Sequence, residues 1–154
     1  PDVHEIRMDA EAMLNSRERT SRELERILFE VQSALDNGLN PLLTWDRAPI
    51  QGPASTHRER SQRLNAALSG LMRRVGLGVH AVGGLVLVGG DTAEAVLTGF
   101  GAKGISMRSE VMPGISAGVV IGGDADSRAV IAKAGGFGED DALLKALEYL
   151  RGEP

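Results

Sequence analysis

The chain has 154 residues, of which 42% are hydrophobic and 25% are charged, and its formal net charge is −4. This composition is typical of a globular domain, and the acidic balance argues against a general nucleic-acid binder, which would carry a basic face. The absence of cysteine excludes disulfides, thiolate metal sites and cysteine nucleophiles, and it is compatible with a cytoplasmic protein. No apolar run approaches the roughly 20 residues that span a bilayer, so we expect neither a nucleic-acid nor a membrane partner.

The first part of the chain predicts a strand followed by two helices. Residues 3–8 alternate apolar and polar side chains, as a strand does, and Asp9 is placed to cap a short helix that reaches Leu14. A longer helix is predicted over residues 20–35, because its apolar residues repeat at helical spacing. Asn37-Gly38 ends that helix, since glycine accepts the left-handed conformation of a helix terminus. The apolar stripe consists of Leu24, Ile27, Leu28, Val31 and Leu35.

The middle of the chain predicts a short buried strand over residues 40–44, a loop over residues 46–55 and an amphipathic helix over residues 56–75. The loop is indicated by two prolines and a glycine. Residues 85–88 are all apolar, which is typical of a strand that is covered on both faces. We therefore expect this strand to be central in its sheet.

Shorter elements fill the rest of the chain, and they predict an α/β domain with a mixed β-sheet and helices packed on its faces. By its length the chain is expected to be one domain over residues 1–154. The last helix should begin after Asp140 or Asp141 and bury a stripe of leucines at positions 143, 144, 147 and 150. The remaining predicted elements are a helix over residues 93–98, strands over residues 105–112, 118–121 and 128–132, and a turn at Pro113-Gly114.

The segment Gly89-Gly90-Asp91-Thr92 joins a predicted strand to a predicted helix and is the first candidate binding site. The first N–H groups of a helix lack intrahelical partners, and the helix dipole adds partial positive charge there. Two glycines remove the side chains that would keep a phosphate away, and ligands bind at the carboxyl ends of strands in open α/β sheets. The alternative, which spacing alone slightly favours, is a tight turn in which Asp91 or Thr92 caps the helix.

The second candidate is the glycine-rich segment from Lys133 to Gly138. Its glycines allow backbone N–H groups to face a phosphate or an adenine edge, and Lys133 could supply a cation. The alternative is a flexible loop that Phe137 pins to the core. A third segment, residues 113–118, is on physical grounds a turn between strands. The three histidines lack the spacing of metal ligands, so no metal site is predicted in the chain.

Taken together, in this order and spacing, the three glycine-rich segments resemble the C-terminal half of four-carbon acid sugar kinases. The resemblance is carried by residues 88–93, 113–115 and 133–138, and more loosely by the opening strand and helices and by residues 38–42. One departure is Ala134, which stands where a serine is common in the family. The lost hydroxyl would remove one hydrogen bond, worth about 1 kcal/mol.

The resemblance implies that the chain binds ATP, with contacts at Gly89, Gly90, Asp91 and Thr92 and, in the later loop, at Gly135 and Gly136. It also implies Mg²⁺, which Asp91 would approach through water unless it contacts the nucleotide directly. Members of the family phosphorylate threonate, erythronate or related oxo-acids.

The resemblance further implies that this chain is the C-terminal part of a longer two-domain kinase. The sugar acid and the catalytic acid would then belong to an N-terminal domain that this chain lacks, so we expect no catalytic residue here and little or no activity of the chain alone. One alternative function is a non-catalytic module that binds a nucleotide or a phosphorylated metabolite. Another is a structural or interaction domain in which the glycine-rich turns serve only folding. A homodimer is an open alternative for the assembly.

Overall fold

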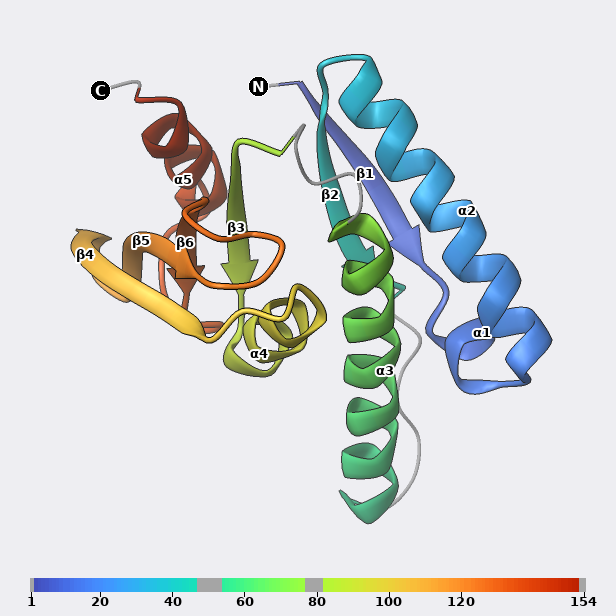
Figure 1. Ribbon diagram of the computed structural model, residues 1–154. Helices are drawn as coiled ribbons and strands as arrows, with labels where there is room; N and C mark the ends of the chain where they lie inside the picture. The colour runs from blue at the N-terminus through green and yellow to red at the C-terminus, as the bar shows by residue number, and fades with distance from the viewer. Residues whose placement is uncertain (1, 47–53, 77–81, 153–154) are drawn as a thin grey trace. The chain divides into compact units, whose positions relative to one another are not determined.

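The computed structural model describes residues 2–46, 54–76 and 82–152 (Figure 1). The chain divides into two compact units, Pro1–Leu71 and Met72–Pro154, and helix α3 (Ala54–Val75) carries the chain from one to the other. The predicted loop over residues 46–55 falls mostly outside the described residues, and α3 begins two residues earlier than predicted. None of the described helices is both long and apolar enough to cross a membrane.

The first unit is built on two parallel strands, β1 (Val3–Met8) and β2 (Asn40–Trp45). Helices α1 (Ala10–Leu14) and α2 (Arg17–Asp36) connect them (Figure 1). Asp9 caps α1 as predicted, by accepting a 2.8 Å hydrogen bond from the amide of Ala12. Helix α2 begins three residues earlier than predicted, because the Ser16 hydroxyl accepts a hydrogen bond from the amide of Arg19.

The prediction that residues 40–44 form a buried strand is correct in the strand but wrong in the burial. The side chain of Leu42 is 38% exposed. In the register Leu42 pairs with Glu5, whereas Leu43 pairs with the buried Ile6. Because successive residues of a strand face opposite sides, Leu42 lies on the face of this sheet that is away from Ile6. An apolar strand pattern does not by itself reveal that only one face is covered.

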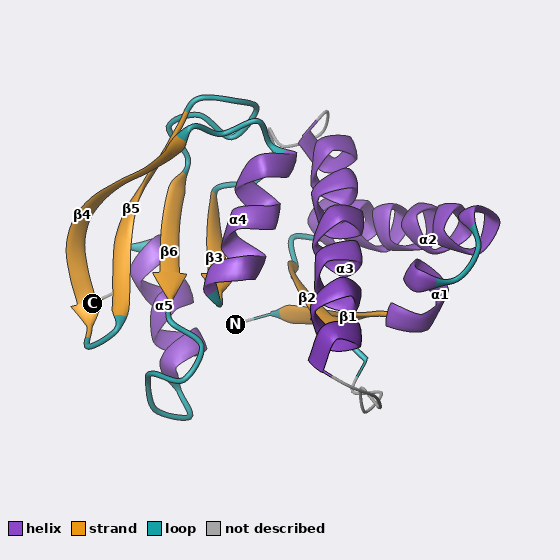
Figure 2. Ribbon diagram, turned by 90° about the horizontal axis from the view of Figure 1, so that it is seen from below, coloured by secondary structure: helices purple, strands orange, loops and turns teal. Residues whose placement is uncertain are grey.

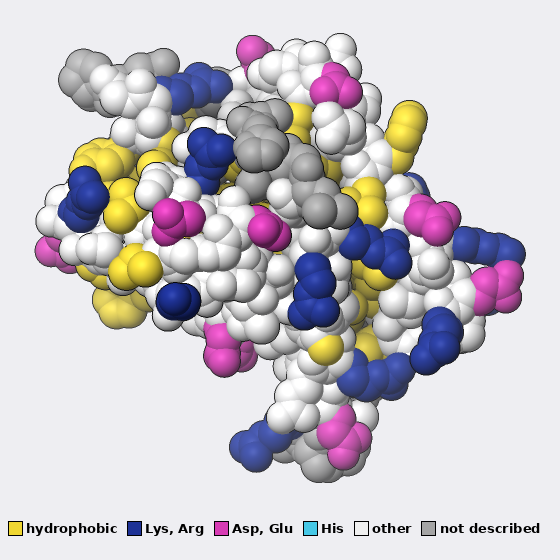
Figure 3. All heavy atoms as spheres, in the orientation of Figure 1, with side chains coloured by type: hydrophobic (Ala, Val, Ile, Leu, Met, Phe, Trp, Pro, Cys, Tyr) yellow, Lys and Arg dark blue, Asp and Glu magenta, His cyan; other side chains and the backbone are white. Residues whose placement is uncertain are grey.

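An ion pair on α2 links this helix to the end of β1 and to the start of α1. The side chain of Glu23 is only 9% exposed, and its carboxylate accepts a 2.8 Å hydrogen bond from the amide of Asp9 and another from Nε of Arg26. Arg26 also donates to the carbonyl of Arg7 at the end of β1. The hydrogen bonds from Arg26, together with that from Asp9, lower the pKa of Glu23 against the opposing effect of burial. Elsewhere along α2, Figure 3 shows basic and acidic side chains next to one another, in keeping with exposed pairs such as Arg22 with Glu18.

We expect Glu23→Gln to destabilise the chain in a pH-dependent way. The pKa of Glu23 is lowered by folding, so its carboxylate contributes stability above about pH 4.3, the ordinary glutamate pKa, and this contribution is lost as the pH falls through the lowered value. The variant should lose about 1–3 kcal/mol of unfolding free energy at pH 7, and less than that at pH 3. Urea unfolding across this pH range measures the difference.

Glu18→Gln is the matched control, since it removes an exposed carboxylate of the same helix that pairs with Arg22. We expect it to change stability by less than about 1 kcal/mol. A Glu23→Gln penalty that stayed constant down to pH 3 would contradict the electrostatic explanation.

The second unit is a four-stranded mixed sheet, as predicted, with the strand order β3-β6-β5-β4. Strands β3 and β6 are parallel, and the other two pairs are antiparallel. Figure 2 shows α4 and α5 on opposite faces of this sheet. The elements are β3 (Gly84–Val88), α4 (Gly90–Gly99), β4 (Gly104–Met112), β5 (Ile115–Ile121), β6 (Ala129–Lys133) and α5 (Ala142–Arg151).

The expected central position of residues 85–88 is wrong, because β3 lies at one end of the strand order. Its burial is also less than predicted: Leu87 is buried, but Val88 is 37% exposed. Helices α4 and α5 both contact β3, and an edge strand between two helices needs the same apolar side chains as a central one. The apolar run could not distinguish these two positions.

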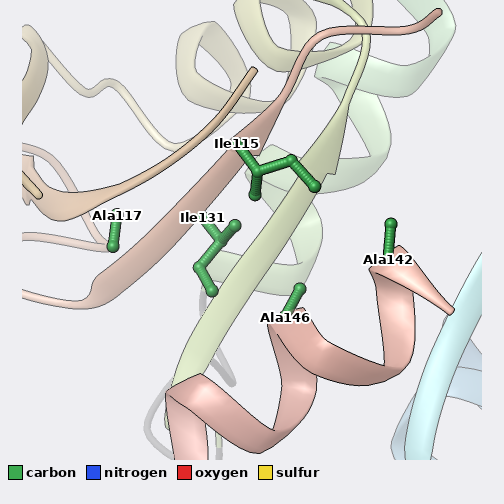
Figure 4. Packing of buried hydrophobic residues seen from close by; sticks show 5 residues of the cluster. All are labelled: Ile115, Ala117, Ile131, Ala142 and Ala146. Atoms are coloured by element: carbon green, nitrogen blue, oxygen red, sulfur yellow. The ribbon is translucent and has the colours of Figure 1, made fainter. Parts of the chain in front are cut away.

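Helix α5 packs on the sheet through two alanines, with Leu150, one of the predicted leucines, packed beside them. Ala142 and Ala146, one turn apart, face Ile115 and Ile131 of the sheet (Figure 4). Leu143 and Leu144 are each 39% exposed, so their predicted burial is wrong. The alanines let the helix backbone approach the sheet closely. The apolar residues of α5 occupy overlapping faces, so periodicity alone did not identify the buried one.

The two positions Ile131 and Leu143 test this packing. We expect Ile131→Ala to lower the unfolding free energy by about 2–5 kcal/mol, because the fully buried side chain leaves a cavity. Leu143→Ala removes a side chain of similar size that is 39% exposed and lies outside the buried cluster, so its cost should be smaller, below about 2 kcal/mol. Urea denaturation of both variants checks the difference, and equal costs would place the packing face of α5 elsewhere.

Candidate functional site

The three glycine-rich segments meet at one end of the strands of the four-stranded sheet. Strands β3 and β6 are parallel, so their carboxyl ends lie at the same end of the sheet, where Val88 pairs with Lys133. Lys133 also pairs with Ile115 at the start of β5, directly after the β4–β5 turn. Adjacent strands are about 4.8 Å apart. Segments that are widely separated in the sequence are therefore neighbours.

Backbone hydrogen bonds join these segments into one continuous rim. The amide of Gly89 donates to the carbonyl of Lys133 over 2.9 Å, and the amide of Ala134 donates to the carbonyl of Gly114 over 3.1 Å. The first bond ties the β3–α4 junction to the end of β6. The second ties the start of the later loop to the β4–β5 turn.

The β3–α4 junction exposes the first turn of a helix that no side chain caps. Gly89 is the N-cap residue with φ +88°, and Gly90, Asp91 and Thr92 belong to the helix itself. The alternative in which Asp91 or Thr92 caps the helix is therefore wrong. The amide N–H groups of Gly90, Asp91 and Thr92 make no hydrogen bond to another residue that the structure describes. These donors and the helix dipole favour an anion at this position.

The later loop adds two more amide groups of the same kind. The amide of Phe137 donates to the carbonyl of Ala134 over 3.2 Å, which closes a turn around Gly135 and Gly136. Within the described part of the chain, the N–H groups of Gly135 and Gly136 have no hydrogen-bond partner. Successive free backbone N–H groups of a turn form anion-binding concavities.

Three of the glycines at this rim are not required by the chain's own conformation or packing. Gly90, Gly135 and Gly136 have no positive φ angle, and a Cβ atom added to any of them would meet no described atom within 4 Å. By contrast, a Cβ on Gly138, at φ +95°, would lie 2.9 Å from Cβ of Ala142. The open glycines leave room for a ligand against the backbone. Elsewhere in the described part of the chain, Gly70, Gly83 and Gly104 share both properties.

The β4–β5 turn supports the later loop through Phe137. Gly114 has φ +77°, as the predicted turn requires, and a Cβ there would lie 2.7 Å from Cβ and Cγ of Phe137. Phe137 is 60% exposed. The alternative in which Phe137 pins the loop to the core is therefore wrong, because this side chain lies against Gly114 at the surface.

The charged groups at the rim are Asp91, Lys133 and Glu110, whose carboxylate accepts a 3.3 Å hydrogen bond from the amide of Gly114. Asp91 is exposed in the first turn of α4. The ammonium of Lys133 donates to the carbonyls of Ala134 and Gly135 over 3.2 and 3.1 Å. Sequence reasoning placed Lys133 near the site as a cation but missed these contacts, for which no sequence signal exists. No three His, Cys, Asp or Glu side chains gather as a metal cluster anywhere in the described ranges.

The paired variants Gly89→Ala and Gly90→Ala separate the two kinds of glycine at the junction. Gly89→Ala forces a side chain into a positive φ with an extended ψ and should cost about 1–3 kcal/mol of stability. Gly90→Ala meets open space in a helical position and should leave stability unchanged or slightly raised, since alanine favours helices. Thermal unfolding measures both, and a large loss for Gly90→Ala would mean that Gly90 serves folding.

Residues 2–143 match the family model described as a nucleotide-binding C-terminal domain. The chain is 41% identical over 90 residues to a D-threonate kinase of Salmonella typhimurium, which covers 58% of the chain and 20% of that kinase. It is 31% identical over 142 residues to a D-erythronate kinase of Heliobacterium modesticaldum, which covers 86% of the chain and 32% of that kinase. The matched part is thus a fifth to a third of these relatives.

Solved structures agree with this match. A domain of unknown function from Bordetella bronchiseptica, solved with bound citrate as a domain-swapped dimer, aligns with a TM-score of 0.67 and 28% identity over 98% of this chain and 34% of its own. A structure from Salmonella typhimurium described as a putative tRNA synthase aligns with a TM-score of 0.68 over 96% of this chain and 34% of its own. At 20% identity, the latter supports the fold alone.

Proposed function

The chain belongs to the nucleotide-binding C-terminal domains of the four-carbon acid sugar kinase family, and on this premise we propose that its glycine-rich rim binds the phosphates of ATP. One observation carries the proposal. Five backbone amide N–H groups follow the ends of two adjacent parallel strands and lack partners among the described residues. They belong to Gly90, Asp91, Thr92, Gly135 and Gly136. The open space at three of these residues lets a phosphate approach the backbone.

The two groups of donors have different parts in this proposal. The first turn of α4 offers three amides and the positive end of a helix dipole, so it would hold the most charged part of the ligand. The loop after β6 offers the amides of Gly135 and Gly136 from the neighbouring strand end. Gly89 holds the two parts together through its bond to the carbonyl of Lys133 rather than through a contact with ligand.

Mg²⁺ fits the site as an ion that is bound mainly by phosphate and water. Asp91 is the carboxylate among the candidate residues, and a carboxylate beside phosphates is favourable only when a cation lies between them. Because Mg²⁺ keeps several waters and takes one or two carboxylates in such sites, Asp91 would hold it through water. When bound, the ion would offset the negative charge of the phosphates.

The sugar acid and the reaction belong to the longer protein in this proposal. The chain covers only a fifth to a third of its kinase relatives, and an N-terminal domain would hold the threonate, erythronate or related acid. Phosphoryl transfer depends on positioning two substrates in line, so this chain alone would bind ATP in the cytoplasm without phosphorylating a sugar acid. The domain-swapped dimer of the Bordetella bronchiseptica neighbour supports a homodimer as the assembly.

Calorimetric titration with Mg-ATP, Mg-free ATP and AMP tests the proposal. We expect Mg-ATP to bind more tightly than AMP, because AMP lacks the β- and γ-phosphates. Gly90→Val should weaken Mg-ATP binding at least tenfold, about 1.4 kcal/mol, while the domain stays folded, because its added side chain occupies the open space above the backbone.

Gly104→Val is the matched control. Gly104 is equally open, but it begins β4 and pairs with Ile121 at the end of the sheet opposite the rim. The Gly104→Val variant should bind Mg-ATP like the unmodified chain. Unchanged affinity in a folded Gly90→Val variant would remove the phosphate role. Equal affinities for AMP and Mg-ATP would favour the alternative module, which does not use a triphosphate.

A further inference from the structure

Lys133 makes hydrogen bonds with both glycine-rich segments. Its backbone carbonyl accepts the hydrogen bond from Gly89, which begins the first segment. Its ammonium donates to the carbonyls of Ala134 and Gly135 in the second. One residue at the end of β6 thus contacts the backbone of both parts of the site.

The ammonium contacts dictate where two amide groups of the loop point. In a trans peptide unit the C=O and the N–H are in one plane and point in opposite directions. The carbonyls of Ala134 and Gly135 belong to the same peptide units as the amides of Gly135 and Gly136. Because both carbonyls face the Lys133 ammonium, both amides face away from it. These are the two loop amides that have no partner among the described residues.

The stem of Lys133 lies on the α5 side of the sheet. Residues 131 and 133 are on the same face of β6, and Ile131 packs against Ala142 and Ala146 of α5. A Cβ on Gly138 would lie 3.4 Å from Cε of Lys133, so the glycine leaves room for the stem. Helix α4, with the other free amides, covers the opposite face (Figure 2). This placement favours action on the loop over a direct contact at the start of α4.

The charge of Lys133 is directed at the loop rather than at a carboxylate. No ion pair links Lys133 to an Asp or Glu of the described residues, whereas Lys145 pairs with Glu139 and Asp141 nearby. A cation that polarises two carbonyls also strengthens the N–H groups of the same peptide units as donors. Both effects favour an anion on the outer side of the loop.

We propose that Lys133 is a positioning residue, whose ammonium fixes the peptide units between residues 134 and 136 so that the amides of Gly135 and Gly136 are presented to the nucleotide phosphates. This inference rests on the proposed nucleotide-binding function. It assigns to Lys133 no contact with ligand. The order imposed on the loop therefore exists before a nucleotide binds, and it can be measured without one.

The first arm of the test uses the whole 154-residue chain without ligand. Lys133→Met keeps a long apolar stem but removes the donors, and we expect the ¹⁵N order parameters of Gly135 and Gly136 to fall from about 0.85 to below about 0.6. Lys103→Met, which removes the same charge at the opposite end of the sheet, should leave these order parameters unchanged. Order parameters that stay high in Lys133→Met overturn the inference.

The second arm measures Mg-ATP affinity at two salt concentrations. Lys133→Met should bind at least tenfold more weakly at both, and Lys133→Arg, which restores the donors, should recover most of the affinity. A loss that nearly disappears at high salt, with the loop still rigid, shows a direct ion contact and overturns the positioning role. If the unmodified chain binds no nucleotide, the proposed function fails first and the inference fails with it.

A measurement on the unmodified chain covers the case in which Lys133→Met does not fold. Scalar couplings through the hydrogen bonds should connect Nζ of Lys133 to the carbonyl carbons of Ala134 and Gly135. Their absence, with a freely rotating ammonium, overturns the inference without any variant.

Discussion

The parallel pairing of β3 with β6 is the constraint on which the candidate site depends. It brings the carboxyl ends of two strands, at Val88 and Lys133, to the same end of the sheet. Each strand ends in a glycine-rich segment, and the bond from Gly89 to the carbonyl of Lys133 continues the ladder one residue beyond the strands. An antiparallel pairing would have put the two segments at opposite ends of the sheet. The proposed binding of phosphate by two groups of amides is possible only because of this direction.

The glycines of the second unit serve two different physical purposes. Some are required by the chain itself: Gly114 combines a positive φ with the close approach of Phe137, and a Cβ on Gly123 would overlap the backbone of Phe100. Others, such as Gly90 and Gly135, have neither a positive φ nor a close neighbour. Gly114 shapes the rim, Gly123 allows a close backbone approach at the other end of the sheet, and the second group leaves the backbone of the rim accessible. A sequence shows only that glycine is frequent, whereas the three-dimensional neighbours separate these groups.

The two units place their charged groups differently. In the first, Arg26 donates both to the buried carboxylate of Glu23 and to the end of β1, so an ion pair joins a helix to a strand. In the second, Lys133 turns to backbone carbonyls instead. Neither arrangement was visible in the sequence. Glu23 looks like an ordinary polar residue of an amphipathic helix, and Lys133 looks like a free cation, because partners that are distant along the chain decide both.

The sequence by itself determined the kind and approximate extent of the elements, because helical spacing, strand alternation and glycine stops are local properties. It also determined the family, through three short segments in order. Tertiary structure decided which faces are buried, as Ala142 and Ala146 of α5 show against the predicted Leu143 and Leu144, and it decided that β3 is an edge strand. It also decided that Gly89 rather than Asp91 or Thr92 is the N-cap residue. These features depend on packing and pairing between residues far apart in the chain, which no local pattern encodes.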